Sequence, residues 1–281
     1  HPGASQMRSL DEEFKNFMPL WSWTTKGSDE RYPNVVFAPG IIQATDGHRL
    51  ASIRATTSVE ESFAIRGTHL ELAKALGNMD GETIHWGRYS THLLVKGLGW
   101  QLAVPALTGS SVDFPSTSDL MAPFSSPAWA GVVKGADITK FLRIARKSAQ
   151  DTVGKHTSPM AVIIPTEAGL SFSYTVVSEE KTNVAVPVPD VVFGSRESGA
   201  HDIKPFGVNP SYLAAAVDMI GSVEVRILLG AFSGGINPSQ PALIEGGSPL
   251  RRALVMPMRI ETVPVTVDDL LRSRAAAGKV A

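Results

Sequence analysis

One pattern, an amphipathic helix followed by about three short strands, occurs four times in this sequence and limits its possible folds more than any other feature. The predicted helices begin roughly every 60 to 75 residues. They cover residues 10–18, 68–77, 137–150 and 209–220. The repeat predicts four similar units of helix and sheet. The predicted strands are 34–42, 49–55 and 62–66 after the first helix, 83–86, 91–95 and 101–104 after the second, 160–164, 170–176 and 183–186 after the third, and 224–229, 242–245 and 253–258 after the fourth.

The ends of the predicted helices carry residues that are typical of helix boundaries. Pro19 stops the first helix, because proline cannot continue the helical hydrogen-bond ladder. Thr68 is the expected N-cap of the second helix. Asn209 is the expected N-cap of the fourth, with Pro210 in the first turn and Gly221 after the last residue.

Chain length and one Ser/Pro-rich stretch predict two domains. The chain has 281 residues, and about 150 residues per domain is the usual ratio. Residues 113–127 (DFPSTSDLMAPFSSP) fall between the second and third helical units and are the expected interdomain linker. The domains are expected to span 7–115 and 128–261, followed by a tail at 262–281. Residues 1–6, which precede the first methionine, are interpreted as an expression remnant outside the fold.

Composition and missing motifs argue against an enzyme. The chain has no cysteine, which excludes disulfides, thiolate nucleophiles and cysteine-based zinc sites. No His-Glu-x-x-His motif, phosphate-binding P-loop, dinucleotide fingerprint or G-x-S-x-G turn occurs. We therefore expect no catalytic residues, no metal and no cofactor. Because no apolar run approaches the ~18 residues of a membrane span and no signal peptide is evident, the expected location is the cytoplasm.

The predicted helix 137–150 has a strongly basic face opposite its apolar stripe. No acidic residue lies among the cations of this face, so only a bound polyanion would relieve their mutual repulsion. Contact with nucleic-acid phosphates is one interpretation, and an ordinary solvated face is the other. The net charge of −1 and the lack of an aromatic residue on this face favour the second interpretation. The basic residues are Lys140, Arg143, Arg146 and Lys147.

Two short motifs resemble those of one protein family. Residues 45–51 read TDGHRLA and residues 255–260 read VMPMRI. In this order, both are similar to the bacterial DNA polymerase III sliding clamp (beta subunit) family, in its middle and C-terminal domains respectively. Phe114 with Pro115, and the N-x-x-Y pattern of 209–212, are further points of similarity. The chain is identified as a short form that resembles the second and third domains of this family.

The resemblance implies an α+β class and a DNA-clamp fold, with two clamp domains that each pack two helices on antiparallel sheets. It also implies a processivity factor that encircles duplex DNA independently of sequence. The basic residues of helix 137–150 would contact the DNA. DNA polymerase, other replication and repair proteins and the clamp loader would be tethered through short peptides in a hydrophobic pocket where two domains meet. The implied pocket residues are Thr45, Gly47, His48, Arg49, Leu50, Pro115, Asn209, Tyr212, Leu254, Val255, Met256, Pro257 and Met258.

The two motifs also have simpler interpretations that do not involve binding. Asp46 followed by Gly47 is typical of a tight turn between two strands. Met256 and Met258 around Pro257 suit an edge strand that fills a gap in a core. Methionine equally suits a surface that accepts different peptides, because its side chain is unbranched and polarisable. Both interpretations remain open from the sequence.

The sequence departs from the family in several respects. The first domain of the family has no counterpart, so a ring of six domains is expected to need a head-to-tail homotrimer. An excised fragment and an open assembly are the alternatives to this trimer. Residues 116–120 replace the tyrosine and arginines that usually follow Phe-Pro, and Asp269-Leu270-Leu271 in the tail resembles the acidic-Leu-aromatic end of clamp-binding peptides. The alternative function is a clamp-like interaction module, or a clamp antagonist, that binds partner peptides without encircling DNA. An enzyme on an α+β scaffold is the third hypothesis.

Overall fold

The computed structural model describes residues 8–9, 18–25, 31–55, 61–80, 85–89, 91–97, 100–108, 114–178, 183–186, 188, 191–199, 205–230, 241–247 and 250–258. The chain forms two compact units, which are described separately: unit 1 is His1–Ser116 with Ser248–Arg251, and unit 2 is Thr117–Gly247 with Arg252–Ala281. Residues 1–6, most of the predicted helix 10–18 and the tail 262–281 lie outside the described residues.

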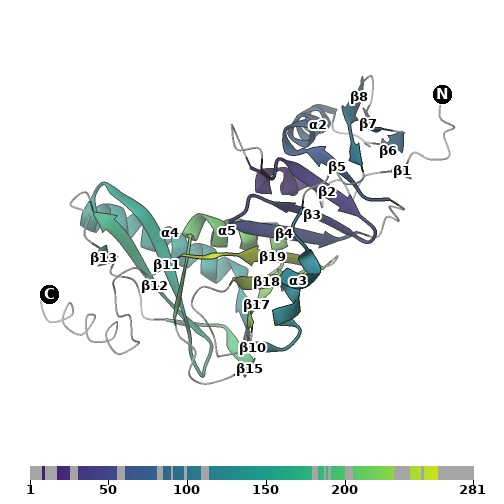
Figure 1. The fold of residues 1–281 in the computed structure, drawn as a ribbon. Helices are drawn as coiled ribbons and strands as arrows, with labels where there is room; N and C mark the ends of the chain where they lie inside the picture. Colours follow the sequence, from purple (N-terminus) through teal and green to yellow (C-terminus); the bar gives the residue numbers. More distant parts are fainter. Residues whose placement is uncertain are drawn as a thin grey trace, which may run out of the picture. The chain divides into compact units, whose positions relative to one another are not determined.

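Unit 1 contains two sets of four strands (Figure 1). In each set a short leading strand comes first and three consecutive strands follow it. In the second set, helix α2 (Gly67–Asp80) lies between the leading strand and the three that follow. The strands of the first set are β1 (Arg8–Ser9), β2 (Asn34–Ala38), β3 (Ile41–Thr45) and β4 (Arg49–Arg54). Those of the second set are β5 (Phe63–Arg66), β6 (His85–Tyr89), β7 (His92–Gly97) and β8 (Trp100–Pro105), and unit 1 also contains the 3-10 helix η2 (Met18–Trp23) and β9 (Leu107–Thr108).

Unit 2 repeats the order of one strand, one helix and three strands twice (Figure 1). The first repeat is β10 (Pro127–Lys134), α4 (Gly135–Val153), β11 (His156–Pro165), β12 (Leu170–Ser178) and β13 (Asn183–Val186). The second is β16 (Phe206–Val208), α5 (Pro210–Ile220), β17 (Glu224–Gly230), β18 (Ala242–Gly246) and β19 (Arg251–Val255). The remaining elements are α3 (Thr117–Met121), η4 (Ala122–Phe124), β14 (Val192–Phe193), β15 (Ser195–Gly199) and β20 (Pro257–Met258).

The leading strand of each repeat joins the sheet of the other repeat in the same unit. In unit 2, β10 pairs with β17 and β16 pairs with β11, giving the orders β15-β10-β17-β18-β19 and β13-β12-β11-β16-β20. In unit 1, β5 pairs with β2 and β1 pairs with β6, giving β4-β3-β2-β5-β9 and β1-β6-β7-β8. The predicted helix with three following strands is confirmed at α2, α4 and α5. Of these leading strands, β5 corresponds to the predicted strand 62–66, whereas β1, β10 and β16 were not predicted. All four tie the two repeats of their unit together.

Glycine begins two of the helices because a neighbouring segment approaches closely at each one. A Cβ atom at Gly135, the first residue of α4, would lie 3.0 Å from Val217 Cγ1 and 3.4 Å from the Ser222 carbonyl oxygen. A Cβ atom at Gly67, the first residue of α2, would collide with Thr24 Oγ1. Both helices start earlier than predicted, because these glycines permit close packing where glycine usually signals a helix break.

The apolar face of α4 packs against its sheet. Phe141 meets Phe172 of β12 with the ring centroids 5.2 Å apart, and Phe193 of β14 lies 6.1 Å from the first ring and 5.5 Å from the second. Ile138 and Ala145, on the same helical face, are fully buried. The predicted apolar stripe is therefore confirmed, and the opposite face of α4 points away from this core.

Three segments fold differently from the sequence-based expectation. Residues 34–42 form the hairpin β2–β3 with a turn at residues 39–40 instead of one strand. The predicted strand 253–258 is interrupted at Met256, between β19 and β20. The expected linker 113–127 contains α3 and η4, with Phe124 only 6% exposed. Its Ser/Pro composition favours a loop, but the burial of one aromatic ring outweighs that preference.

Candidate functional site

The outward face of α4 carries four exposed cations. Acidic residues lie only near the ends of this helix, at Asp137 and Asp151. In the part of the chain that the structure describes, none of the four cations forms an ion pair. Among the described residues, no carboxylate within ion-pair distance offsets their repulsion, and the face presents concentrated positive charge. The four residues are Lys140, Arg143, Arg146 and Lys147.

A groove of about 440 Å³ runs between α4 and α5 within unit 2, and we call it the α4–α5 groove. Gly135 and Val217, which approach each other closely, both line it. Lys140 and Arg143 line it from α4, and Asp218 lines it from α5. Two of the four cations thus share a concave surface with one carboxylate.

The other end of the basic face is close to the sheet. Burial raises the pKa of Tyr174 on β12, and the positive charge of Arg146 partly opposes that rise. Arg146 therefore lies near enough to the phenol to interact with it electrostatically. Arg146 and Lys147 are not among the residues that line the α4–α5 groove.

In unit 1, the turn between β3 and β4 is held by hydrogen bonds of Thr45. The Thr45 hydroxyl donates to the Arg49 carbonyl oxygen at 2.7 Å and accepts from the Gly47 N–H at 3.1 Å. Gly47 has φ +86, a conformation that glycine adopts without strain. The predicted tight turn is thus present, with Gly47 and His48 exposed at its tip.

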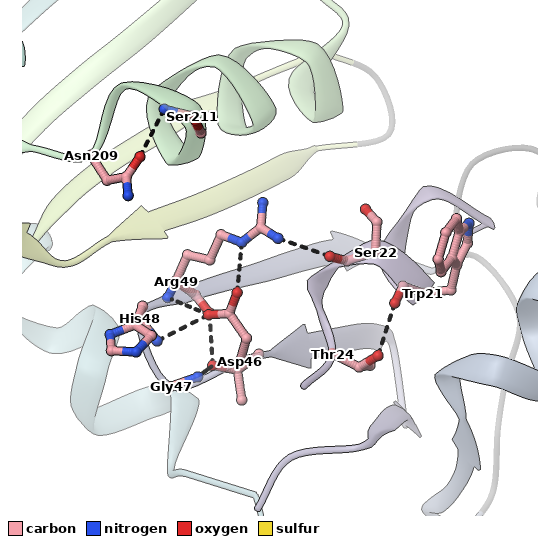
Figure 2. A network of polar contacts seen from close by, with 10 residues as sticks. Trp21, Ser22, Thr24, Asp46, Gly47, His48, Arg49, Asn209 and Ser211 are labelled. Atoms are coloured by element: carbon pink, nitrogen blue, oxygen red, sulfur yellow. Dashed lines mark hydrogen bonds and ion pairs between the residues drawn. The ribbon is translucent and has the colours of Figure 1, made fainter. Parts of the chain in front are cut away.

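Asp46 and Arg49 form the polar centre of this turn (Figure 2). Asp46 Oδ1 accepts from the backbone N–H groups of His48 and Arg49, both at 3.0 Å. Arg49 Nε donates to Asp46 Oδ2 at 2.9 Å, and Arg49 Nη2 donates to the Ser22 carbonyl oxygen at 2.8 Å. The guanidinium carbon also lies 4.6 Å from the ring centre of Trp23, a cation–π contact. Arg49 therefore joins the turn to η2.

In unit 2, α5 begins beside β20. Ser211 N–H donates to the Asn209 side-chain oxygen at 2.9 Å, so Asn209 is the predicted N-cap (Figure 2). The residue before it, Val208 of β16, pairs with Pro257 of β20. Strand β16 therefore brings the start of α5 next to the second motif within unit 2, and Tyr212 in the first turn of α5 is half-buried.

Exposure divides the predicted peptide-contacting residues into three groups. Met256 is 40% exposed, and Gly47 and His48 are also exposed. A second group is half-buried and comprises Arg49, Pro115, Asn209, Tyr212, Pro257 and Met258. The buried group is Thr45, Leu50, Leu254 and Val255. The side chains of this last group are inaccessible to a partner in this structure.

Sequence reasoning missed Trp23 and Ser22 as supports of the turn. Ser22 precedes Arg49 by 27 residues, and nothing near it in the sequence indicates the contact. The role of Asp46 had a local signal, because an aspartate before glycine commonly accepts hydrogen bonds from the backbone that follows.

Among the described residues no group of three or more His, Asp or Glu side chains is arranged to hold a metal ion. None of the described helices has the length and apolar character to cross a membrane.

Replacing Asp46 tests how far the turn depends on its carboxylate. We expect Asp46→Ala to lower the free energy of unfolding by about 2 kcal/mol, because the backbone N–H groups of His48 and Arg49 and the Arg49 guanidinium all lose their acceptor. Asp46→Asn is expected to lower it by about 1 kcal/mol, because the amide oxygen still accepts from the backbone N–H groups and only the charged acceptor of Arg49 is lost. Urea denaturation measures both changes. The control Asp151→Asn, at an exposed position, is expected to stay within about 0.5 kcal/mol of wild type. Wild-type stability in both Asp46 variants would contradict the assignment.

Comparison with solved structures identifies the fold. The DNA polymerase sliding clamp from Bacillus subtilis superposes with a TM-score of 0.65 and 18% identity over 91% of this chain and 64% of that one. The beta subunit from the DNA polymerase of Streptococcus pyogenes gives 0.65 and 16% over 90% and 65%. The DNA polymerase III subunit beta from Pseudomonas aeruginosa gives 0.65 and 16% over 92% and 68%. No protein-family model and no curated protein sequence matches the chain.

These similarities confirm the predicted α+β class and DNA-clamp fold. The chain spans just under two thirds of the Bacillus subtilis and Streptococcus pyogenes clamps, at 64% and 65% of their lengths. Over that length it has the fold of DNA polymerase III beta sliding clamps.

Proposed function

We propose that this protein is a sliding-clamp processivity factor, which encircles duplex DNA and performs no catalysis itself. The observation that carries the proposal is the exposed, uniformly basic face of α4 on a clamp fold. The solved proteins with which the chain superposes are themselves described as DNA polymerase sliding clamps. A clamp needs a cationic surface toward the duplex, and α4 supplies one in unit 2.

The proposed contact between α4 and DNA is electrostatic and independent of sequence. Lysine and arginine attract phosphates regardless of the bases between them, so the contact holds the duplex and leaves it free to move. The net charge of −1 does not oppose this attraction. Screening at physiological salt suppresses charges beyond about 8 Å, so the four clustered cations determine the local field.

We further propose that partner peptides contact the exposed tip of the β3–β4 turn and the surface formed by β20 and the start of α5. The proposed partners are DNA polymerase, the clamp loader and other replication or repair proteins. Met256 is 40% exposed beside the half-buried Met258, and flexible thioether side chains adapt to different apolar ligands. The Asp46–Arg49 hydrogen bonds support this proposal, since they fix the shape of the turn before a peptide arrives.

Retention on circular DNA tests the encircling function directly. Protein is assembled on nicked circular plasmid at low salt and then washed at about 0.5 M salt, which removes proteins held by phosphate contacts alone. We expect a clamp to stay bound, because topological linkage does not depend on charge. Cutting the plasmid once with a restriction enzyme should release it within minutes.

Two controls distinguish topological linkage to the DNA from binding through phosphate contacts. Linear DNA with both ends blocked by bulky protein should retain the clamp, whereas linear DNA with free ends should not. Light scattering on the same preparation should give three times the 30.0 kDa chain mass if the ring is the expected trimer. Equal retention on cut and uncut plasmid, or a monomer at micromolar concentration, would count against the ring. The same function would place the protein in the cytoplasm.

A further inference from the structure

Of the four cations on the basic face of α4, two line the α4–α5 groove and two do not. Lys140 and Arg143 line the groove, opposite Asp218 of α5. Arg146 instead interacts electrostatically with Tyr174 of the sheet. The groove therefore distinguishes Lys140 and Arg143, which line it, from the other two cations, which do not.

The walls of the groove suit a single negative charge. Two cations and one carboxylate give the lining a formal charge of +1. A phosphodiester carries one negative charge, and arginine and lysine are the side chains that bind its oxygens best. Phosphate monoesters and polyphosphates carry more negative charge, and Asp218 would repel the excess. The hydroxyl-bearing Ser222 and the apolar Val217 also line the groove, and they suit the adjoining sugar.

We propose that the α4–α5 groove holds one phosphodiester group of the DNA backbone between Lys140 and Arg143, with Asp218 excluding more highly charged phosphates. The inference rests on the proposed function and deepens it, because it separates one defined docking point from the diffuse attraction of the whole helix. Arg146 and Lys147 then add general attraction without holding a particular phosphate.

The test compares two variants that lose the same charge from the same helix, Lys140→Gln with Arg143→Gln and Arg146→Gln with Lys147→Gln. Affinity for a duplex of about 20 base pairs is measured by fluorescence anisotropy over a series of salt concentrations. We expect the first variant to lose about tenfold more affinity than the second. All four positions are exposed, so thermal melting should show both variants folded.

Asp218→Asn provides an independent test, because this substitution is expected to raise the affinity for DNA where the paired variants lower it. It should raise the affinity of wild type for duplex DNA several-fold, and it should have no such effect in the Lys140→Gln, Arg143→Gln background. Adenosine triphosphate and inorganic phosphate serve as competitors that distinguish a backbone phosphodiester from free phosphates. Neither is expected to displace the duplex at concentrations that leave ionic strength unchanged.

The possible outcomes separate the groove from the proposed function. Equal losses in the two paired variants, or no effect of Asp218→Asn, would overturn the groove assignment and leave α4 as a general DNA-binding face. Displacement of the duplex by triphosphate, abolished in the Lys140→Gln, Arg143→Gln variant, would overturn the choice of a phosphodiester. No loss in either paired variant would overturn the α4 contact with DNA, and with it both proposals.

Discussion

Reversing three charges on α4, with Lys140→Glu, Arg143→Glu and Lys147→Glu together, is expected to reduce DNA affinity at physiological salt by at least about 100-fold. Each phosphate contact that is lost removes counterion release, so the slope of log affinity against log salt should fall by about 0.9 per contact. The introduced carboxylates would also repel the backbone. Anisotropy titrations of a labelled duplex at several salt concentrations measure both quantities.

The fold should survive these substitutions, because all three side chains are exposed on the face opposite the buried stripe of α4. A matched control reverses three exposed cations in unit 1, at Arg31, Arg54 and Arg66. This control changes the net charge equally, so it isolates position from total charge. Similar losses in both variants would mean that DNA responds only to net charge, and the assignment of α4 would be wrong.

Helices α2, α4 and α5 were predictable because their signals are local. The apolar stripe of α4 and the cap of α5 each lie within a few turns of chain, and Asn209 with Pro210 marks the start of α5 almost to the residue. The leading strands β10 and β16 were not predicted. Strand β16 has only three residues, Phe206–Val208, and its partner β11 belongs to the other repeat, so no local pattern reveals the pairing.

The candidate sites also contain some features that local sequence patterns predict and others that depend on segments far apart in the chain. Spacing alone placed the four cations on one helical face, since positions three, four and seven apart share a side of a helix. The α4–α5 groove was not predictable, because it needs Asp218 from a helix some 70 residues later in the chain and the close approach at Gly135. The contact of Arg49 with Trp23 was missed for the same reason: it joins two segments that share no sequence pattern.

Truncating Met256, which is exposed, or Met258, which is half-buried, is expected to weaken peptide binding. Met256→Ala and Met258→Ala should each reduce the affinity for a clamp-binding peptide by about 1 to 3 kcal/mol, because a truncated anchor loses buried contact with its ligand. The probe is a synthetic fluorescent peptide with the acidic-Leu-aromatic ending, and anisotropy gives its dissociation constant. Met256 is 40% exposed in the free protein, so it has contact area left to bury against a peptide.

The decisive control removes an equally exposed apolar side chain elsewhere. Leu107 on β9 of unit 1 is 38% exposed, close to the value for Met256, so Leu107→Ala matches the loss of apolar surface. It should leave peptide affinity unchanged. DNA affinity should stay at the wild-type level in both methionine variants, since the cations of α4 are intact. Unchanged peptide affinity in both methionine variants would remove β20 from the binding surface, whereas equal weakening by Leu107→Ala would show that the peptide adheres to apolar surface without a defined site.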